Sequence, residues 1–306
     1  MKRWLYAGII ISIGSVACVI LGSKWLEQST LPYVDFDTSM KMAQHPDKMT
    51  PGWGQPIMQS FKTLYERNNV KNITYDPTLR IPRIIHQIWL GSPLPEKYHA
   101  WQATWKQFHP GWEYHLWTDA DIEKLHKLGD FFIGNTYHYY QEATNYGERS
   151  DILKILLIHY YGGLYVDTDF ECLRSCELFH HYYDMYIGIQ PLDVAYVQLG
   201  YALFGASPRH PFIRKVIDTL PLARQYPEII RRTGPLMITE CFARYAAEIS
   251  GRIAALPASY FYPRDYNDPI EPRANWIKPE SFAVHHWAGS WLAPEANIVQ
   301  IFRPNQ

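Results

Sequence analysis

Two aspartates with one residue between them are the part of this sequence whose chemistry is easiest to read. Asp167 and Asp169 follow residues 164–166, which we predict to be a short buried strand. Open α/β sheets bind ligands beyond the carboxyl ends of their strands, so both carboxylates are expected at a ligand-binding edge. Alternation along the strand would turn both side chains in the same direction. Paired carboxylates favour a hard divalent cation, and such a cation suits a diphosphate.

The residues before this pair predict a helix that ends at two glycines. Residues 137–161 are mostly helical in pattern, and Gly162-Gly163 follows them because glycine readily adopts the left-handed conformation at a helix end. Within that helix Asp151 and Lys154 are three residues apart and therefore neighbours on its surface. The apolar stripe of the helix is predicted to comprise Ile152, Ile155, Leu156 and His159.

Together these strings resemble a known signature. Ser-Asp-x-x-(Arg/Lys), Gly-Gly-x-Tyr and Asp-x-Asp in this order are similar to the glycosyltransferases with the DXD sugar-binding region. That group includes the yeast-type initiating α-1,6-mannosyltransferases, the inositol-phosphorylceramide mannosyltransferases and, more remotely, the large clostridial glucosylating toxins. The resemblance extends over roughly residues 80 to 292. It implies a GT-A-like, Rossmann-type α/β domain with a mixed, mainly parallel sheet, and Mn²⁺ or Mg²⁺ as cofactor.

The resemblance also implies roles for residues around the aspartate pair. Asp169 would contact the metal directly, and Asp167 would contact the metal or the ribose of the donor. Asp151 would bind sugar hydroxyls. Lys154 stands where the family usually has arginine, so the bidentate fork is lost while the charge is kept. Arg149 is the alternative source of that fork.

Two tryptophan-containing strings complete the predicted donor site. Trp89, in Ile-His-Gln-Ile-Trp, would stack on the nucleobase. In His-His-Trp-Ala-Gly-Ser-Trp near the C-terminus, a histidine or the Ser290 hydroxyl would complete the metal shell, and we count Ser290 among the donor-binding residues. Trp291 would reach the leaving diphosphate. The residues leave open whether His285 or His286 binds the metal.

Two further positions leave the sugar and the acceptor open. Relatives often carry a site asparagine where this chain has Tyr201. The Thr-Gly-Pro string at residues 233–235 either faces an acceptor cleft or simply starts a helix, as proline near the first helical position does.

Composition excludes several other classes of function. The 306 residues carry a net charge of -1, so no general attraction to nucleic acid is expected. The chain has no P-loop, Gly-x-Gly-x-x-Gly or Ser-His-Asp order, which leaves an NTPase or a hydrolase triad without support. The four cysteines lack zinc-site spacing, and whether Cys172 pairs with Cys176 is open.

The N-terminus predicts a membrane anchor. Residues 4–21 are almost wholly apolar, and about 18–20 such residues can span a bilayer as a helix. We favour an uncleaved signal-anchor over a cleaved signal peptide. Because Lys2-Arg3 precedes the run, a single-pass type II membrane protein is expected, in the Golgi or secretory pathway of a eukaryote or the inner membrane of a bacterium. The predicted parts are residues 1–26 (cytoplasmic tip and anchor), 27–78 (stem) and 79–306 (catalytic domain).

Alternating strands and helices in the last of these parts predict a sheet with parallel strands. The expected strands are residues 83–90, 114–117, 164–166 and 195–204, and the expected helices are residues 96–108, 119–128, 137–161, 212–220 and one that begins near Gly234.

The sequence therefore predicts an enzyme, a metal-dependent retaining glycosyltransferase. It would move a hexose, mannose from GDP-mannose being favoured, to a hydroxyl of a lipid, a glycan or a protein. UDP-glucose, UDP-galactose and UDP-GlcNAc are the alternative donors. Other classes are a membrane-anchored sugar-nucleotide-binding or glycan-binding protein without catalysis, and, if the N-terminus is cleaved, a secreted effector that glycosylates a host protein.

Overall fold

The structure, a computed structural model, describes residues 30–41, 54–191, 197–265 and 269–290. Contacts divide the chain after Pro32, and the unit that begins at Tyr33 contains the helices and strands of those ranges. The predicted anchor at residues 1–26 lies outside the described residues. Within the described ranges, no helix is both long and apolar enough to cross a membrane.

Two sheets organise the unit that begins at Tyr33. The six strands of the larger sheet are β1 (Ile84–Ile88), β2 (Glu113–Trp117), β3 (Gly163–Val166), β5 (Met185–Ile189), β6 (Leu199–Ala206) and β7 (Ile253–Leu256). Their order in space is β2-β1-β3-β6-β5-β7. β6 runs antiparallel to both of its neighbours, and the other three pairings are parallel. A separate antiparallel pair is formed by β4 (Phe170–Cys172) and β8 (Ala283–His285).

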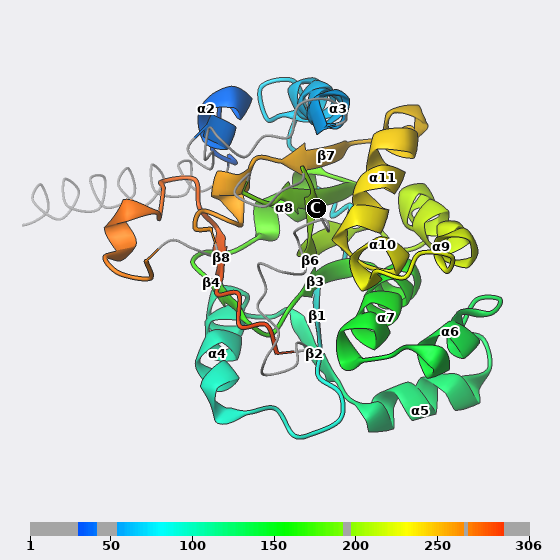
Figure 1. Cartoon of the computed structure of the whole chain (residues 1–306). Helices are drawn as coiled ribbons and strands as arrows, with labels where there is room; N and C mark the ends of the chain where they lie inside the picture. The colour runs from blue at the N-terminus through cyan, green and yellow to red at the C-terminus, as the bar shows by residue number, and fades with distance from the viewer. Residues whose placement is uncertain (1–29, 42–53, 192–196, 266–268, 291–306) are drawn as a thin grey trace, which may run out of the picture. The chain divides into compact units, whose positions relative to one another are not determined.

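The described residues also form α-helices. They are α2 (Phe36–Lys41), α3 (Gly54–Asn68), α4 (His99–Phe108), α5 (Asp119–Leu128), α6 (Thr136–Glu142), α7 (Tyr146–Tyr161), α8 (Glu177–Tyr182), α9 (Pro211–Ala223), α10 (Ile229–Arg232) and α11 (Pro235–Tyr245). In Figure 1, α7, α9 and α11 lie on one side of the sheet, and α4 lies with β4 and β8 on the other. The core is the set of apolar side chains between these layers.

The predicted α/β class with a mixed, mainly parallel sheet is confirmed. The helix predicted at residues 119–128 coincides with α5, where Thr118 and Asp121 form a reciprocal capping box and Gly129 ends the helix in the left-handed conformation. β5 and β7 were not predicted. Both are short and wholly buried, so they lack the alternation of apolar and polar residues that marks a half-exposed strand.

The prediction of one helix with a single apolar stripe at residues 137–161 was wrong. The segment is two helices, α6 and α7, and residues 152–158 of α7 are buried on every side. The physical reason is that α7 contacts the sheet on one side and α6 and α9 on others, so no face of its middle turns reaches water. Asn145 begins α7, because its side chain accepts a hydrogen bond from the Glu148 N–H at 2.9 Å.

The described part of the predicted stem contains α2 and α3, and α3 packs on the sheet. α3 lies against β7, and the Asn68 amide donates a hydrogen bond to the carbonyl of Ile253 at 2.8 Å. α2 contacts the short 3-10 helix Ala258–Tyr260. The boundary between stem and catalytic domain at residue 79 stays a prediction.

The two cysteines whose pairing was open are free, buried thiols. Burial raises the pKa of both Cys172 and Cys176 above the usual thiol value. Since the thiolate is the reactive form, neither side chain is prepared to act as a nucleophile.

Replacing Gly163 by alanine is expected to destabilise the protein strongly, because this glycine opens β3 at φ 98° and an added Cβ would lie 2.6 Å from the carbonyl oxygen of Ile84. Gly129→Ala is the matched control, since Gly129 has φ 86° with open space around it. Conformational strain costs roughly 1–2 kcal/mol at either site. The clash should add about 1–3 kcal/mol at Gly163 alone. Equal losses of unfolding free energy in urea titrations would contradict this reading.

Candidate active site

A cavity of about 400 Å³ opens at the edge of the sheet where β1, β3 and β5 end. Its wall also includes the first half of β6, the beginning of α7, and residues 229–235. Seven of the residues predicted for the site line it: Trp89, Asp151, Lys154, Asp167, Asp169, His285 and Ser290. Arg149 and His286 are not among the lining residues, and Trp291 lies outside the described part of the chain.

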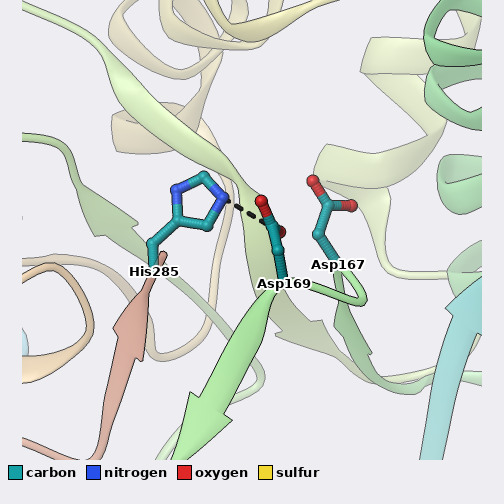
Figure 2. A group of neighbouring side chains, drawn as sticks. All are labelled: Asp167, Asp169 and His285. Carbon is teal, nitrogen blue, oxygen red and sulfur yellow. Dashed lines mark hydrogen bonds and ion pairs between the residues drawn. The ribbon is translucent and has the colours of Figure 1, made fainter. Parts of the chain in front are cut away.

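The aspartate pair lies in a turn between β3 and β4. The Asp167 N–H donates to the carbonyl of Ala202 at 2.8 Å, and the Phe170 N–H donates back to the carbonyl of Asp167 at 3.2 Å. The expectation that strand alternation aligns the two side chains was therefore wrong, because β3 ends at Val166. The turn brings them together instead. Figure 2 shows the two carboxylates beside each other, with His285 facing Asp169.

Asp167, Asp169 and His285 form a group that fits a divalent cation. One ligand atom from each lies within 4.8 Å of the others. The Nε2 atom of His285 is 3.1 Å from Asp169 Oδ1, and its buried Nδ1 has no hydrogen-bond partner within the described residues. Carboxylate oxygens suit Mg²⁺ and Mn²⁺, and an imidazole nitrogen is a common further ligand for transition metals.

The electrostatics of the pair also favour a cation. Burial raises the pKa of Asp167, and the neighbouring charge of Asp169 adds to the rise although Lys154 opposes it. Burial acts on Asp169 in the same direction, but His285 and the Ala288 N–H outweigh it and lower the pKa of Asp169. Two carboxylates held this close repel when both are ionised. A divalent cation between them would relieve that repulsion.

The structure separates the two histidines that the sequence left open. In the β4–β8 ladder His285 pairs with Phe170, and β8 ends at His285. His286 follows the strand and has other partners: its Nε2 lies 3.0 Å from Glu171, and its ring stacks on Trp101 at 4.4 Å. Of the two, His285 is the candidate metal ligand.

Lys154 connects the donor-site carboxylates. Its Nζ lies 2.9 Å from Asp151 and 3.7 Å from Asp167, and it donates to the carbonyl of Tyr201 at 3.3 Å. Burial by itself lowers the pKa of Lys154, but the two carboxylates outweigh it and keep the amine charged. Burial also raises the pKa of Asp151 to about 6, with Lys154 opposing. The Thr233 hydroxyl, 3.2 Å from Asp151, adds a further contact.

Arg149 lies beside the cavity rather than in its wall. Its guanidinium is 5.5 Å from the ring centroid of Tyr140 and 5.6 Å from that of Tyr146. Tyr146 does line the cavity. The prediction that Arg149 replaces the missing fork at the donor is thus not supported by its position.

Glu148 is a positioning residue that the sequence reasoning missed. Its side chain is fully buried, accepts two hydrogen bonds from Thr144, and pairs with Arg232 at 2.6 Å and Arg224 at 3.5 Å. These contacts fix the first turn of α7, three residues before Asp151. The position of Glu148 in the first turn of a helix could have been read from the sequence. Its pairing with arginines some 80 residues away could not.

Trp287 was also missed. It lines the cavity at φ 55°, a conformation that is rare for a bulky side chain and is concentrated at functional sites. Its ring centroid lies 4.2 Å from that of His285, and its Nε1 donates to the carbonyl of Arg264 at 3.3 Å. Trp287 therefore holds the candidate metal ligand from one side.

Comparison with known proteins now decides the class. Residues 95–190, which include both aspartates, match the family described as a glycosyltransferase sugar-binding region containing the DXD motif. This chain therefore contains a segment that resembles the sugar-binding region of the DXD glycosyltransferases. The resemblance and the enzyme class predicted from the sequence are thereby confirmed.

Relatives in two yeasts agree with this class. The chain is 28% identical over 262 residues to inositol phosphoceramide mannosyltransferase 3 of Schizosaccharomyces pombe, a match that covers 77% of this chain and 70% of the relative. It is 29% identical over 178 residues to mannosyl phosphorylinositol ceramide synthase CSH1 of Saccharomyces cerevisiae, covering 55% of this chain and 44% of the relative. Among solved structures, the PaToxG glycosyltransferase matches with a TM-score of 0.46 and 18% identity, over 61% of this chain and 78% of that chain.

Glu148→Gln is expected to lower the free energy of unfolding by about 3–5 kcal/mol, because it leaves the Arg232 guanidinium in a buried site without its counter-charge. Glu142→Gln is the matched control. Glu142 pairs with the same Arg224 but is half exposed, so its loss should cost less than about 1 kcal/mol. Urea unfolding of both variants measures the difference, and similar values would show that Glu148 has no special role.

Protonation of the Glu171 carboxylate is expected to lower the stability of the protein in acid. Burial alone would raise the pKa of this carboxyl, but hydrogen bonds from His286 and Arg273 outweigh it and lower the pKa to about 2. Between that value and the ordinary 4.5, the unfolded chain binds the extra proton, so stability rises with pH in this window. The difference in unfolding free energy between wild type and Glu171→Gln should therefore be largest above pH 4.5 and shrink toward pH 2. A difference that does not vary with pH would refute the assignment; exposed Glu113→Gln is the control.

Proposed function

We propose that this chain is a divalent-metal-dependent, retaining glycosyltransferase with a GT-A-like fold. It transfers a hexose, with mannose from GDP-mannose favoured, to a hydroxyl of a lipid or glycan acceptor. The observation that carries the proposal is the convergence of Asp167, Asp169 and His285 in one cavity with the Asp151–Lys154 pair. The names of the yeast relatives, which are mannosyltransferases of inositol phosphoceramide, support mannose as the sugar and a ceramide-linked acceptor.

The metal has a defined place in this proposal. Asp167, Asp169 and His285 would hold Mn²⁺ or Mg²⁺, which supplies Lewis-acid stabilisation of the charge that develops on the leaving nucleoside diphosphate. The role of the chain is to keep these three side chains in position. The Ala288 N–H does so by donating to Asp169 at 2.9 Å.

The remaining residues orient the donor. The buried Lys154 and the partly exposed Asp151 both line the cavity and are placed to bind hexose hydroxyls. Trp89 lines the opposite part of the cavity and offers a ring on which a nucleobase can stack. Ser290 lies at the cavity rim in the described residues, and the contact of Trp291 with the diphosphate stays a prediction from the sequence.

The carboxylates of the cavity support retention of configuration. In the part of the chain that the structure describes, Asp151 and Asp167 both face Lys154, and Asp169 faces His285. Each of these carboxylates thus already has a charged or basic partner, and none is free to act as a general base. The proton of the acceptor hydroxyl would then pass to the leaving phosphate oxygen, on the same face of the sugar.

Membrane anchoring belongs to the same proposal. An apolar run at residues 4–21 would hold the enzyme as a type II protein at a membrane, in the Golgi or secretory pathway of a eukaryote or at the inner membrane of a bacterium. A ceramide-linked acceptor would be confined to that surface. The anchor and the acceptor class therefore support each other.

The test is donor hydrolysis and transfer by the full chain in detergent, with GDP-mannose, UDP-glucose, UDP-galactose and UDP-GlcNAc, in Mn²⁺ or EDTA. We expect one donor to be turned over in Mn²⁺ only. Asp169→Asn should reduce that turnover by at least about a hundredfold, because a preorganised group at the developing charge is lost.

Asp218→Asn is the matched control, since this α9 carboxylate is half exposed, pairs with Arg214 and is not among the lining residues of the cavity. It should retain wild-type turnover. Metal-dependent binding of a donor without turnover would favour a sugar-nucleotide-binding protein. The proposal would be refuted if the protein bound none of these donors and turned over none of them.

A further inference from the structure

Two buried glutamines lie where β5 and β6 continue beyond their ladder. The Gln190 N–H donates to the carbonyl of Gln198 at 3.0 Å, and the preceding pair in register is Ile189 with Leu199. Residues directly opposite in an antiparallel pair extend their side chains from the same face. Gln190 is 5% exposed and Gln198 is 0% exposed. The structure therefore places two amide side chains together in the protein interior.

These amides lack hydrogen-bond partners within the described chain. The Oε1 atom of Gln190 and both amide atoms of Gln198 are buried without one. Native structures keep few such groups, because a buried polar atom without a partner loses its contacts with water and regains nothing. Each one therefore calls for an explanation.

The fold satisfies its other buried glutamines near the site. Gln87 donates to the carbonyl of Asp167 at 3.2 Å and accepts from the Tyr114 hydroxyl. Gln102 donates to Gln87 at 3.4 Å. Both serve the protein's own hydrogen bonding, which is the usual role of a buried amide. Gln190 departs from that role.

The position of Gln190 explains the departure. It lines the same cavity as Asp151 and Lys154, across from the first residues of β6. Tyr201, which also lines the cavity, already uses its hydroxyl as a donor to the carbonyl of Asp151 at 3.0 Å. Gln190 thus presents an uncharged, uncommitted amide to whatever occupies the cavity.

The chemistry of an amide narrows the class of ligand. An amide group offers an acceptor oxygen and a donor nitrogen, which match a hydroxyl that both donates and accepts. A phosphate is best matched by several donors together with positive charge, and the Gln190 amide offers one donor nitrogen and no charge. The occupant that suits this wall is a neutral polyol.

We propose that the Gln190 amide binds a hydroxyl group of the transferred hexose and helps determine which sugar is accepted, with Gln198 packed beside it as a positioning residue. The inference rests on the proposed function. A site built to hydrogen-bond a substrate hydroxyl discriminates strongly against an analogue that lacks it.

The test compares Gln190→Leu with wild type in the full chain, using the donor identified by turnover and its monodeoxy analogues. For the parent donor, kcat/KM should fall about tenfold, the scale of one lost hydrogen bond in a buried site. For the analogue without the contacted hydroxyl, Gln190→Leu and wild type should be equal. The melting temperature without donor should stay the same or rise, because an unsatisfied buried polar group has been replaced by an apolar one.

Asn68→Leu is the matched control for removing a buried amide. Asn68 is also 5% exposed, but it donates to the carbonyl of Ile253, which pairs with Met185 at the opposite end of β5 from Gln190. This variant should melt at a lower temperature with unchanged discrimination among donors. Gln190→Asn is a second variant, which shortens the amide without removing it and should show a smaller loss.

The outcomes separate the inference from the proposed function. Gln190 variants that discriminate like wild type, or that lose melting temperature as Asn68→Leu does, would overturn the inference while wild-type turnover upholds the glycosyltransferase. If wild type turns over no nucleotide-sugar, both fall together.

Discussion

The buried ammonium of Lys154 is the interaction on which the arrangement of this site depends. It joins Asp151 on α7 to Asp167 in the turn after β3, so it fixes the distance between the helix and the turn. The Lys154 side chain is 5% exposed, that of Asp151 13% and that of Asp167 34%. Removing these charges from water, even in part, is costly, and their mutual attraction offsets that cost only while all three keep their positions. The remaining contacts of the region, such as the Glu148–Arg232 pair at the start of α7, act to keep that helix from moving.

The single antiparallel strand is the second constraint. Because β6 runs against its neighbours, its first residues lie at the edge where β3 and β5 end. This brings the carbonyl of Ala202 to the N–H of Asp167, which anchors the turn that carries the aspartates. If β6 were parallel to its neighbours, its last residues rather than its first would lie at this edge of the sheet. The mixed topology therefore builds the cavity floor from backbone as well as from side chains.

Local features of the site could be predicted from the sequence, and long-range ones could not. The aspartate pair, the two glycines before it and the bounds of α5 depend on neighbours within a few residues, and the structure has them where the sequence indicated. In contrast, the arginines that pair with Glu148 and the glutamine that faces the cavity depend on the order of strands in space, which spacing along the chain does not encode.

The β4–β8 pair has a consequence for how the region responds to its surroundings. Two short strands are marginal by themselves, and β8 is held partly by His285 against Asp169. A metal that binds across those two residues adds its own binding free energy to the pairing, as any ligand of the folded form does. If the proposed ion binds there, the free energy that stabilises the β4–β8 pairing increases with the logarithm of the free metal concentration. The free metal concentration in the compartment would then determine how stable the β4–β8 pairing is before a donor binds.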